Sequence, residues 1–184
     1  RAVRGERAAV RPSWPTITLC VLVNVAGVSS WSGVGLGGGL TARAKGGDII
    51  RAHGASTDIP SVMGRFGAFN FAPIADFGLL RSAAEKAEAA GLRFHAGNML
   101  SSDIFYHADG IAGYDTLPAH GVIGVEMEAA TLYTLAARFG VKALTICTMT
   151  DCLITHEEID AEARQTSLTD MVTLALDVAI DERA

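Results

Sequence analysis

The amino-acid sequence predicts an α/β protein built around one core. Apolar runs of strand length alternate with helical segments along most of the chain, as in proteins whose strands are connected by helices. A chain of 184 residues is expected to form one hydrophobic core, and 49% hydrophobic residues with 20 glycines indicate a folded protein with many tight turns. The net charge of −5 gives nucleic-acid binding no electrostatic support.

The hydrophobic pattern predicts strands and helices in alternation. The expected strands are 48–52, 93–98, 122–125 and 143–149. The expected helices are 74–90, 129–139 and 160–180, and Gly91 and Gly140 are good stop signals for the first two. The last helix is amphipathic, with a buried face expected to comprise Leu168, Met171, Val172, Leu174, Ala175 and Val178.

Two of the predicted strands end in acidic side chains. One strand leads into Glu126, Met127 and Glu128, and another leads into Thr150 and Asp151. Because α/β proteins bind ligands where strands end, these two strand ends predict a ligand site.

The residue types at these strand ends suit the binding of a sugar and the donation of a proton. The carboxylates of Glu126 and Glu128 can accept hydrogen bonds from vicinal hydroxyls, and Met127 can pack under a furanose ring. Asp151 can act as a general acid, and Arg164 can orient it. A plainer interpretation stays open on residue types alone: the glutamates are first-turn acids of a helix, and Asp151 is a cap or turn residue.

Several motifs, in order along the chain, resemble those of purine nucleoside phosphorylases of the bacterial hexameric type, within the wider nucleoside phosphorylase and nucleosidase family. The matching stretches are HGASTD (53–58), AFNFAPIADF (68–77), GN (97–98), SSDIFY (101–106), VEMEAA (125–130), TICT (145–148), TD (150–151), THE (155–157) and ARQT (163–166). The resemblance covers residues 34 to 181, and several ordered motifs are more specific than any single pattern.

The resemblance implies a three-layer nucleoside phosphorylase fold, in which helices flank a central mixed sheet. It implies that Asp151 protonates N7 of the departing purine with support from Arg164, and that Glu128 holds the ribose hydroxyls. The other substrate-binding residues would be Phe105, Tyr106, Val125, Glu126, Met127 and Thr150. Cleavage of a glycosidic bond builds positive charge on the sugar and negative charge on the base, so these groups suit the reaction.

The implied function is phosphorolysis of purine ribonucleosides or deoxyribonucleosides to the free base and the sugar 1-phosphate. Phosphate would be a co-substrate, and no metal or organic cofactor is expected. The expected partners are the nucleoside, phosphate and further copies of the chain in a hexamer. Nucleic acid and membrane are not expected partners, and the expected location is the cytoplasm.

The N-terminal part departs from the family pattern. Residues 1–33 carry no motif resemblance, so residues 34–184 are expected to form an incomplete nucleoside phosphorylase domain. Gly33 stands where the family has an arginine, and Leu36 replaces a hydroxyl residue, which leaves the phosphate-binding residues unknown. Two alternatives therefore stay open: a nucleosidase of the same superfamily, or an inactive purine-binding fragment with an open sheet edge. Uridine phosphorylase is disfavoured because a pyrimidine lacks the N7 atom that Asp151 would protonate.

Three further patterns are interpreted as structural. The glycine-rich run 33–38 matches G-x-G-x-x-G, but no helix of sufficient length follows it, so a tight turn between strands is expected. The apolar run 16–28 is expected to be a buried strand or a pair of strands, and not a signal sequence or a membrane span. The cysteines Cys20, Cys147 and Cys152 are odd in number and predict neither a disulfide framework nor a metal site, and Cys147 is expected in the core.

Overall fold

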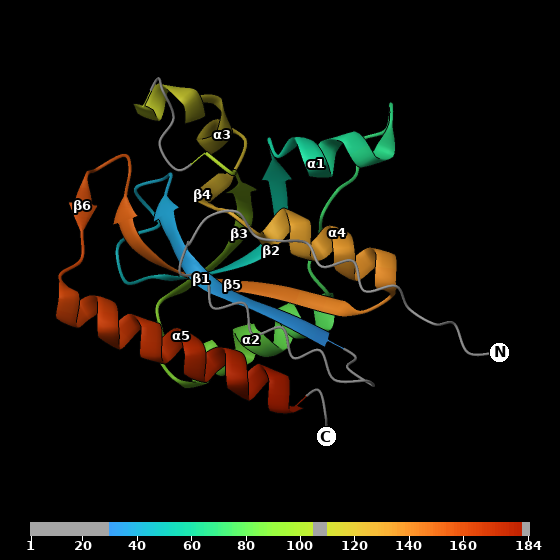
Figure 1. Ribbon diagram of the computed structural model, residues 1–184. Coiled ribbons are helices and arrows are strands. Elements are labelled where there is room, and N and C mark those ends of the chain that lie inside the picture. Colours follow the sequence, from blue (N-terminus) through green and yellow to red (C-terminus); the bar gives the residue numbers. More distant parts are fainter. Residues whose placement is uncertain (1–29, 105–109, 182–184) are drawn as a thin grey trace.

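The computed structural model describes residues 30–104 and 110–181 (Figure 1). The apolar run 16–28, Cys20 and the predicted pocket residues Phe105 and Tyr106 lie outside the described residues. None of the helices within the described ranges is long and apolar enough to cross a membrane.

Strands and helices alternate as the hydrophobic pattern predicts. The strands are β1 (Ser30–Gly39), β2 (Ile49–Thr57), β3 (Phe94–Ser101), β4 (Val122–Glu126), β5 (Lys142–Cys152) and β6 (Glu157–Glu158). The α-helices are α1 (Pro60–Met63), α2 (Phe77–Ala89), α3 (Thr116–Ala119), α4 (Ala129–Phe139) and α5 (Ala161–Asp181), with the 3-10 turns η1 (Gly64–Phe66) and η2 (Gly110–Tyr114). Helix α4 has the predicted bounds, and α5 begins and ends within one residue of the prediction.

The strands form one mixed sheet that closes on itself. The hydrogen-bonded order is β1–β4–β3–β2–β5–β6, and β1 pairs in addition with β5. The β2–β3, β3–β4 and β1–β5 pairs are parallel, whereas β1–β4, β2–β5 and β5–β6 are antiparallel. Closure limits the length of unpaired sheet edge.

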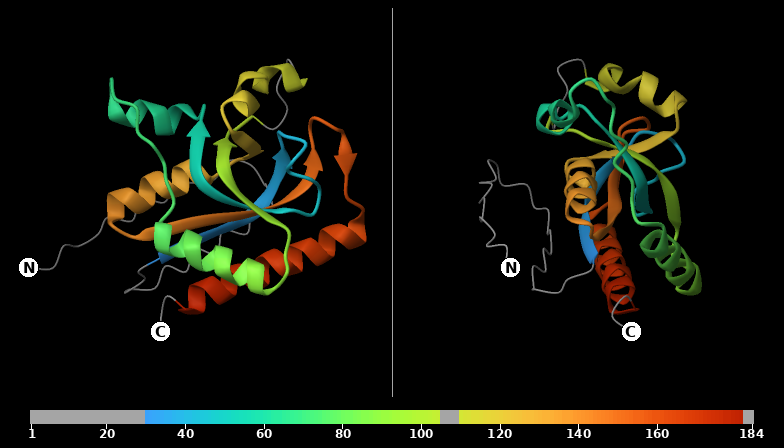
Figure 2. Two further views of the ribbon diagram at one scale, coloured as in Figure 1. Left: turned by 180° about the vertical axis from the view of Figure 1, so that it is seen from behind. Right: turned by 90° about the vertical axis from the view of Figure 1, so that its right-hand side faces the viewer.

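Helices cover the sheet in a three-layer arrangement, as the family resemblance implied. Helix α4 lies above β1 and β5 in Figure 1, and α5 and α2 lie below them; Figure 2 shows the same layers from two further sides. Strand β5 serves both layers because its side chains alternate. Ala143, Cys147 and Met149 join the core cluster that includes α4, whereas Leu144 and Ile146 join the cluster that includes α2 and α5.

Local sequence signals explain where the helices begin and end. Helix α2 starts three residues later than predicted because Asp76 is in extended conformation and its side chain accepts a hydrogen bond from the backbone N–H of Leu79 at 3.0 Å. Helix α4 ends at Gly140, which has a left-handed φ of 65°.

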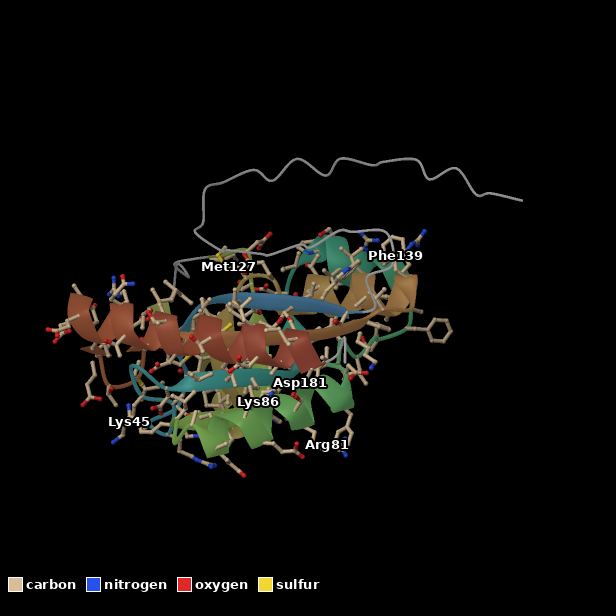
Figure 3. The ribbon with its side chains drawn as sticks, turned by 90° about the horizontal axis from the view of Figure 1, so that it is seen from below. Lys45, Arg81, Lys86, Met127, Phe139 and Asp181 are labelled. Carbon is tan, nitrogen blue, oxygen red and sulfur yellow. The ribbon has the colours of Figure 1, made fainter. Side chains whose placement is uncertain are left out.

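Helices α2 and α5 are tied together by an ion pair of 2.6 Å between Lys86 and Asp181, both labelled in Figure 3.

The glycine-rich run 33–38 forms part of β1, so the expected tight turn is wrong. Strand β1 meets β4 only through Gly38, opposite Val125, and Gly39, opposite Gly124. A Cβ atom on Gly39 would lie 2.5 Å from the backbone oxygen of Ala44, and one on Gly37 would lie 2.8 Å from the backbone oxygen of Val125. The glycines are therefore needed for close approach of neighbouring backbones at the point where the sheet closes.

Candidate active site

The two predicted strand ends meet across β1 at one end of the sheet. Gly38 of β1 is paired with Val125 of β4 on one side and with Asp151 of β5 on the other. Because neighbouring strands lie about 4.8 Å apart, the backbones of Val125 and Asp151 are separated by about 10 Å. The structure thus brings the acidic turn after β4 and the acid of β5 to the same place, as the sequence pattern predicted.

A β-bulge lies immediately before Asp151. Gly37 is paired with Met149, whereas the next residue, Gly38, is paired with Asp151, so Thr150 has no partner on β1. The extra residue places Asp151 in register with Gly38, and bulges next to functional sites commonly re-aim a side chain in this way. Asp151 is half-buried and accepts a hydrogen bond of 2.9 Å from the hydroxyl of Thr150. Both residues lie within β5, which is longer than the predicted strand.

Glu126 ends β4 and is almost fully buried, with 4% of its surface exposed. Its Oε1 atom accepts a hydrogen bond from the hydroxyl of Ser101, the last residue of β3. Its Oε2 atom accepts from the backbone N–H groups of Glu128 at 2.7 Å and Ala129 at 2.8 Å. The carboxylate therefore holds the start of α4, which the plainer interpretation of the sequence allowed for.

Two opposing effects act on the Glu126 carboxyl. Burial raises its pKa, while the hydrogen bonds from Ser101 and from the N–H groups of Glu128 and Ala129 lower it; the net direction is upward. Every hydrogen bond that the structure gives this carboxyl uses it as an acceptor. This environment suits a group that holds the backbone in place.

Glu128 and Met127 occupy the turn between β4 and α4. Both are half-buried, and Glu128 is the N-cap residue of α4. Figure 3 shows Met127 at the same side of the molecule as Phe139, the end of α4, and away from Lys86 and Arg81 of α2. The turn thus lies on the α4 side of the sheet, and the sugar-binding roles of Glu128 and Met127 stay predictions.

Arg164 lies on α5, whereas Asp151 lies in β5. It is exposed on the first turn of α5, and α5 packs on the face of the sheet opposite to α4. The ion pairs found among the described residues do not include Arg164. Its supporting role toward Asp151 stays a prediction.

The two positions that depart from the family's phosphate pattern both lie in β1. Gly33 is buried opposite Thr145, and a Cβ atom there would lie 3.1 Å from side-chain atoms of Leu132 and Thr145. Leu36 is opposite Thr148 and 38% exposed. Neither residue carries a donor for phosphate on its side chain.

The segment that leads to Phe105 and Tyr106 is tied to the end of β2. The hydroxyl of Ser102 donates to Asp58 at 2.9 Å and accepts from the backbone N–H of Ile104 at 3.1 Å. Phe105 and Tyr106 themselves lie outside the described residues, so their predicted contact with the base stays a prediction.

Sequence reasoning assigned no role to Ser101, although the structure places it at the centre of the site's hydrogen bonds. It is fully buried, donates to Glu126 and accepts from the backbone N–H of Ala130 at 2.9 Å. The available signal was its place in the matching motif 101–106, which follows the predicted strand 93–98. The register that pairs Ser101 with Glu126 was not readable from either segment alone.

The sequence profile of the phosphorylase superfamily matches residues 16–180, and the chain belongs to this superfamily. The match begins upstream of residue 34, where the motif resemblance starts. The fold agrees with this assignment, because a mixed sheet flanked by helices is what the motifs implied.

Among curated proteins, two relatives are both named purine nucleoside phosphorylase DeoD-type. They come from Lacticaseibacillus casei (strain BL23) and Lacticaseibacillus paracasei (strain ATCC 334). Each is 41% identical to this chain over 181 residues, in an alignment that covers 95% of this chain and 75% of the relative. The predicted resemblance to bacterial purine nucleoside phosphorylases is thereby confirmed.

Proposed function

We propose that this chain is a purine nucleoside phosphorylase, a pentosyltransferase that converts a purine nucleoside and phosphate into the free purine and the sugar 1-phosphate. One structural observation carries the proposal: Gly38 is paired with Val125 of β4, which leads into the turn that bears Glu128, and with the acid Asp151 of β5. The 41% identity to DeoD-type purine nucleoside phosphorylases supports the same reaction.

The proposed roles follow from the charges that develop as the glycosidic bond breaks. The sugar gains positive charge, which a carboxylate such as that of Glu128 stabilises while it accepts hydrogen bonds from the ribose hydroxyls. The purine gains negative charge, which Asp151 removes by protonating N7. A separation of about 10 Å between the two strand ends allows one nucleoside to contact both groups.

Phosphate is the proposed second substrate, and no metal or organic cofactor takes part in the proposed reaction. Both statements rest on the family resemblance. The residues that bind phosphate are not assigned, because Gly33 and Leu36 stand at two of the family's positions. A nucleosidase, which uses water in place of phosphate, is the second candidate for this reason.

Replacement of Asp151 by Asn tests the proposed acid. Since Asn cannot donate a proton to N7 as a carboxylic acid does, Asp151→Asn is expected to lower kcat for inosine cleavage by at least about 100-fold. Binding of an uncleavable C-nucleoside analogue of inosine is expected to change little. The rates are measured by chromatography of released hypoxanthine.

Asp177→Asn is the matched control, because Asp177 is an exposed acid on α5. It is expected to cleave inosine at the wild-type rate. Unchanged turnover in Asp151→Asn would remove Asp151 from the mechanism, and equal losses in both variants would show a general effect of acid removal.

We further propose that the chain assembles into a homo-oligomer, a hexamer by family resemblance, and acts in the cytoplasm. An exposed apolar surface between α1 and the start of α2 supports the assembly. Its large side chains are exposed by 38–82% and comprise Met63, Phe69, Phe71, Ile74 and Phe77. Apolar surface of this kind marks interaction sites. The mass in solution, measured by light scattering, tests the assembly, and a monomer at micromolar concentration would contradict it.

A further inference from the structure

We propose that Ser101 and Glu126 act together as a positioning pair that places Glu128 for the sugar, and that neither of them contacts the substrate. The proposal rests on the proposed function, because Glu128 is the group that would hold the ribose hydroxyls. It assigns Glu126 a different role from the pocket-lining role that the family resemblance implied.

The pair joins three segments that are distant in sequence. Ser101 ends β3, Glu126 ends β4, and the two residues are directly opposite each other in the parallel β3–β4 register. The backbone N–H of Ser102 also donates to the backbone oxygen of Glu126 at 2.9 Å, which fixes this register at the strand ends. The third segment is the start of α4, whose backbone N–H groups donate hydrogen bonds to both side chains.

Consecutive backbone N–H groups at the start of α4 are satisfied by this pair. Glu126 accepts from the N–H groups of Glu128 at 2.7 Å and Ala129 at 2.8 Å, and Ser101 accepts from that of Ala130 at 2.9 Å. These are donors that a helix cannot satisfy internally at its first turn. The backbone of Glu128 is therefore held directly by Glu126 and, through it, by Ser101.

Both oxygens of Glu126 are already engaged by these donors, and the side chain is 4% exposed. Ser101 is fully buried and uses its hydroxyl as donor to Glu126 and as acceptor from Ala130. Burial therefore shields both groups from a ribose hydroxyl. An effect of either residue on sugar binding is then expected to pass through the turn that bears Glu128.

A double-mutant cycle between Ser101 and Glu128 tests this inference. The dissociation constant of the uncleavable C-nucleoside analogue of inosine is measured by calorimetry for the wild type, Ser101→Ala, Glu128→Ala and the double variant. Ser101→Ala is expected to weaken binding about 10-fold when Glu128 is present and to have no effect when residue 128 is alanine. Binding of free hypoxanthine is expected to be equal in all four proteins.

The same cycle with Ser102→Ala is the matched control, because the hydroxyl of Ser102 bonds to Asp58 and Ile104 and not to Glu126. Its effect is expected to be the same whether or not Glu128 is present. An equal loss for Ser101→Ala in both backgrounds, or a parallel loss of hypoxanthine binding, would overturn the positioning role.

Glu126→Gln is a second variant for the case in which Ser101→Ala does not fold. The amide keeps the size of the side chain and one oxygen for the N–H groups of Glu128 and Ala129, but it removes the acceptor for the Ser101 hydroxyl. We expect it to weaken analogue binding only in the presence of Glu128. Equal weakening in the Glu128→Ala background would contradict the proposal.

These measurements separate failure of the inference from failure of the proposed function. The cycle reads binding without phosphate and without cleavage, so it remains informative for a nucleosidase or an inactive purine-binding protein. A wild-type chain that binds the analogue but gives an additive cycle overturns the positioning pair alone. A folded wild-type chain that does not bind the analogue overturns both the pair and the proposed function.

Discussion

Arg51 is a buried charged residue that is expected to lower the stability of the fold. The residue lies on β2 with 3% of its surface exposed, and among the described residues its Nε and Nη1 atoms have no hydrogen-bond partner. Its guanidinium lies 3.9 Å from the ring centre of Phe94, a cation–π contact. Burial lowers the pKa of Arg51, with the charge of Glu88 opposing the shift. Burial of a cation with unsatisfied donors destabilises the fold by more than a cation–π contact stabilises it.

Replacing Arg51 with Met is therefore expected to stabilise the protein. Met fills a similar volume and needs no hydrogen bonds, so the free energy of unfolding should rise by about 1–3 kcal/mol. Denaturant unfolding followed by circular dichroism measures the change. Arg81→Met is the control, because Arg81 is exposed on α2 and is expected to change stability by less than about 0.5 kcal/mol. A loss of stability in Arg51→Met would show that the guanidinium has partners that stabilise it.

At the residue scale, sequence reasoning predicted candidate positions for the chemistry but could not choose between their roles. The family resemblance placed Glu126 in the pocket, while the plainer interpretation made it a first-turn acid, and its hydrogen bonds follow the plainer one. The choice depends on Ser101, which becomes its neighbour only when β3 and β4 pair. Such long-range pairing is set by the packed sheet and not by either local segment.

At the scale of a secondary-structure element, strand β1 differs from the prediction. Its run of glycines was expected to be a turn, because glycine commonly serves the conformations that turns require. In the structure the glycines serve close approach: β1 is confined between β4 and β5, where a Cβ atom on Gly39 would meet a backbone atom that cannot easily move. The bulge at Thr150 is equally hidden from the sequence, because it is defined by the register with β1.

Gly39→Ala is expected to destabilise the protein by about 1–3 kcal/mol, because its Cβ atom would lie 2.5 Å from the backbone oxygen of Ala44. Gly64→Ala is the matched control. Gly64 has a φ of −70° and no atom within 4 Å of an added Cβ, so a neutral or slightly stabilising effect is expected. Thermal unfolding of both variants measures the difference. Equal effects would mean that closure of the sheet does not depend on the missing side chain at residue 39.

At the scale of the whole molecule, the three layers were predictable and the closure of the sheet was not. Alternating strands and helices with amphipathic faces specify helices on both sides of a sheet. Closure depends on two residue pairs between β1 and β4, Gly38 with Val125 and Gly39 with Gly124. Within the described part of the chain, residues 30–37 of β1 pair with β5 alone.

The measurement that tests the proposed function most directly is cleavage of inosine by the purified chain, with and without inorganic phosphate. Hypoxanthine and ribose 1-phosphate are separated by chromatography and quantified. A purine nucleoside phosphorylase is expected to release both products in equal amounts, and only when phosphate is present. Release of hypoxanthine with free ribose in the absence of phosphate would instead identify a nucleosidase. A folded chain that binds nucleoside but releases no base under either condition would contradict both enzymes.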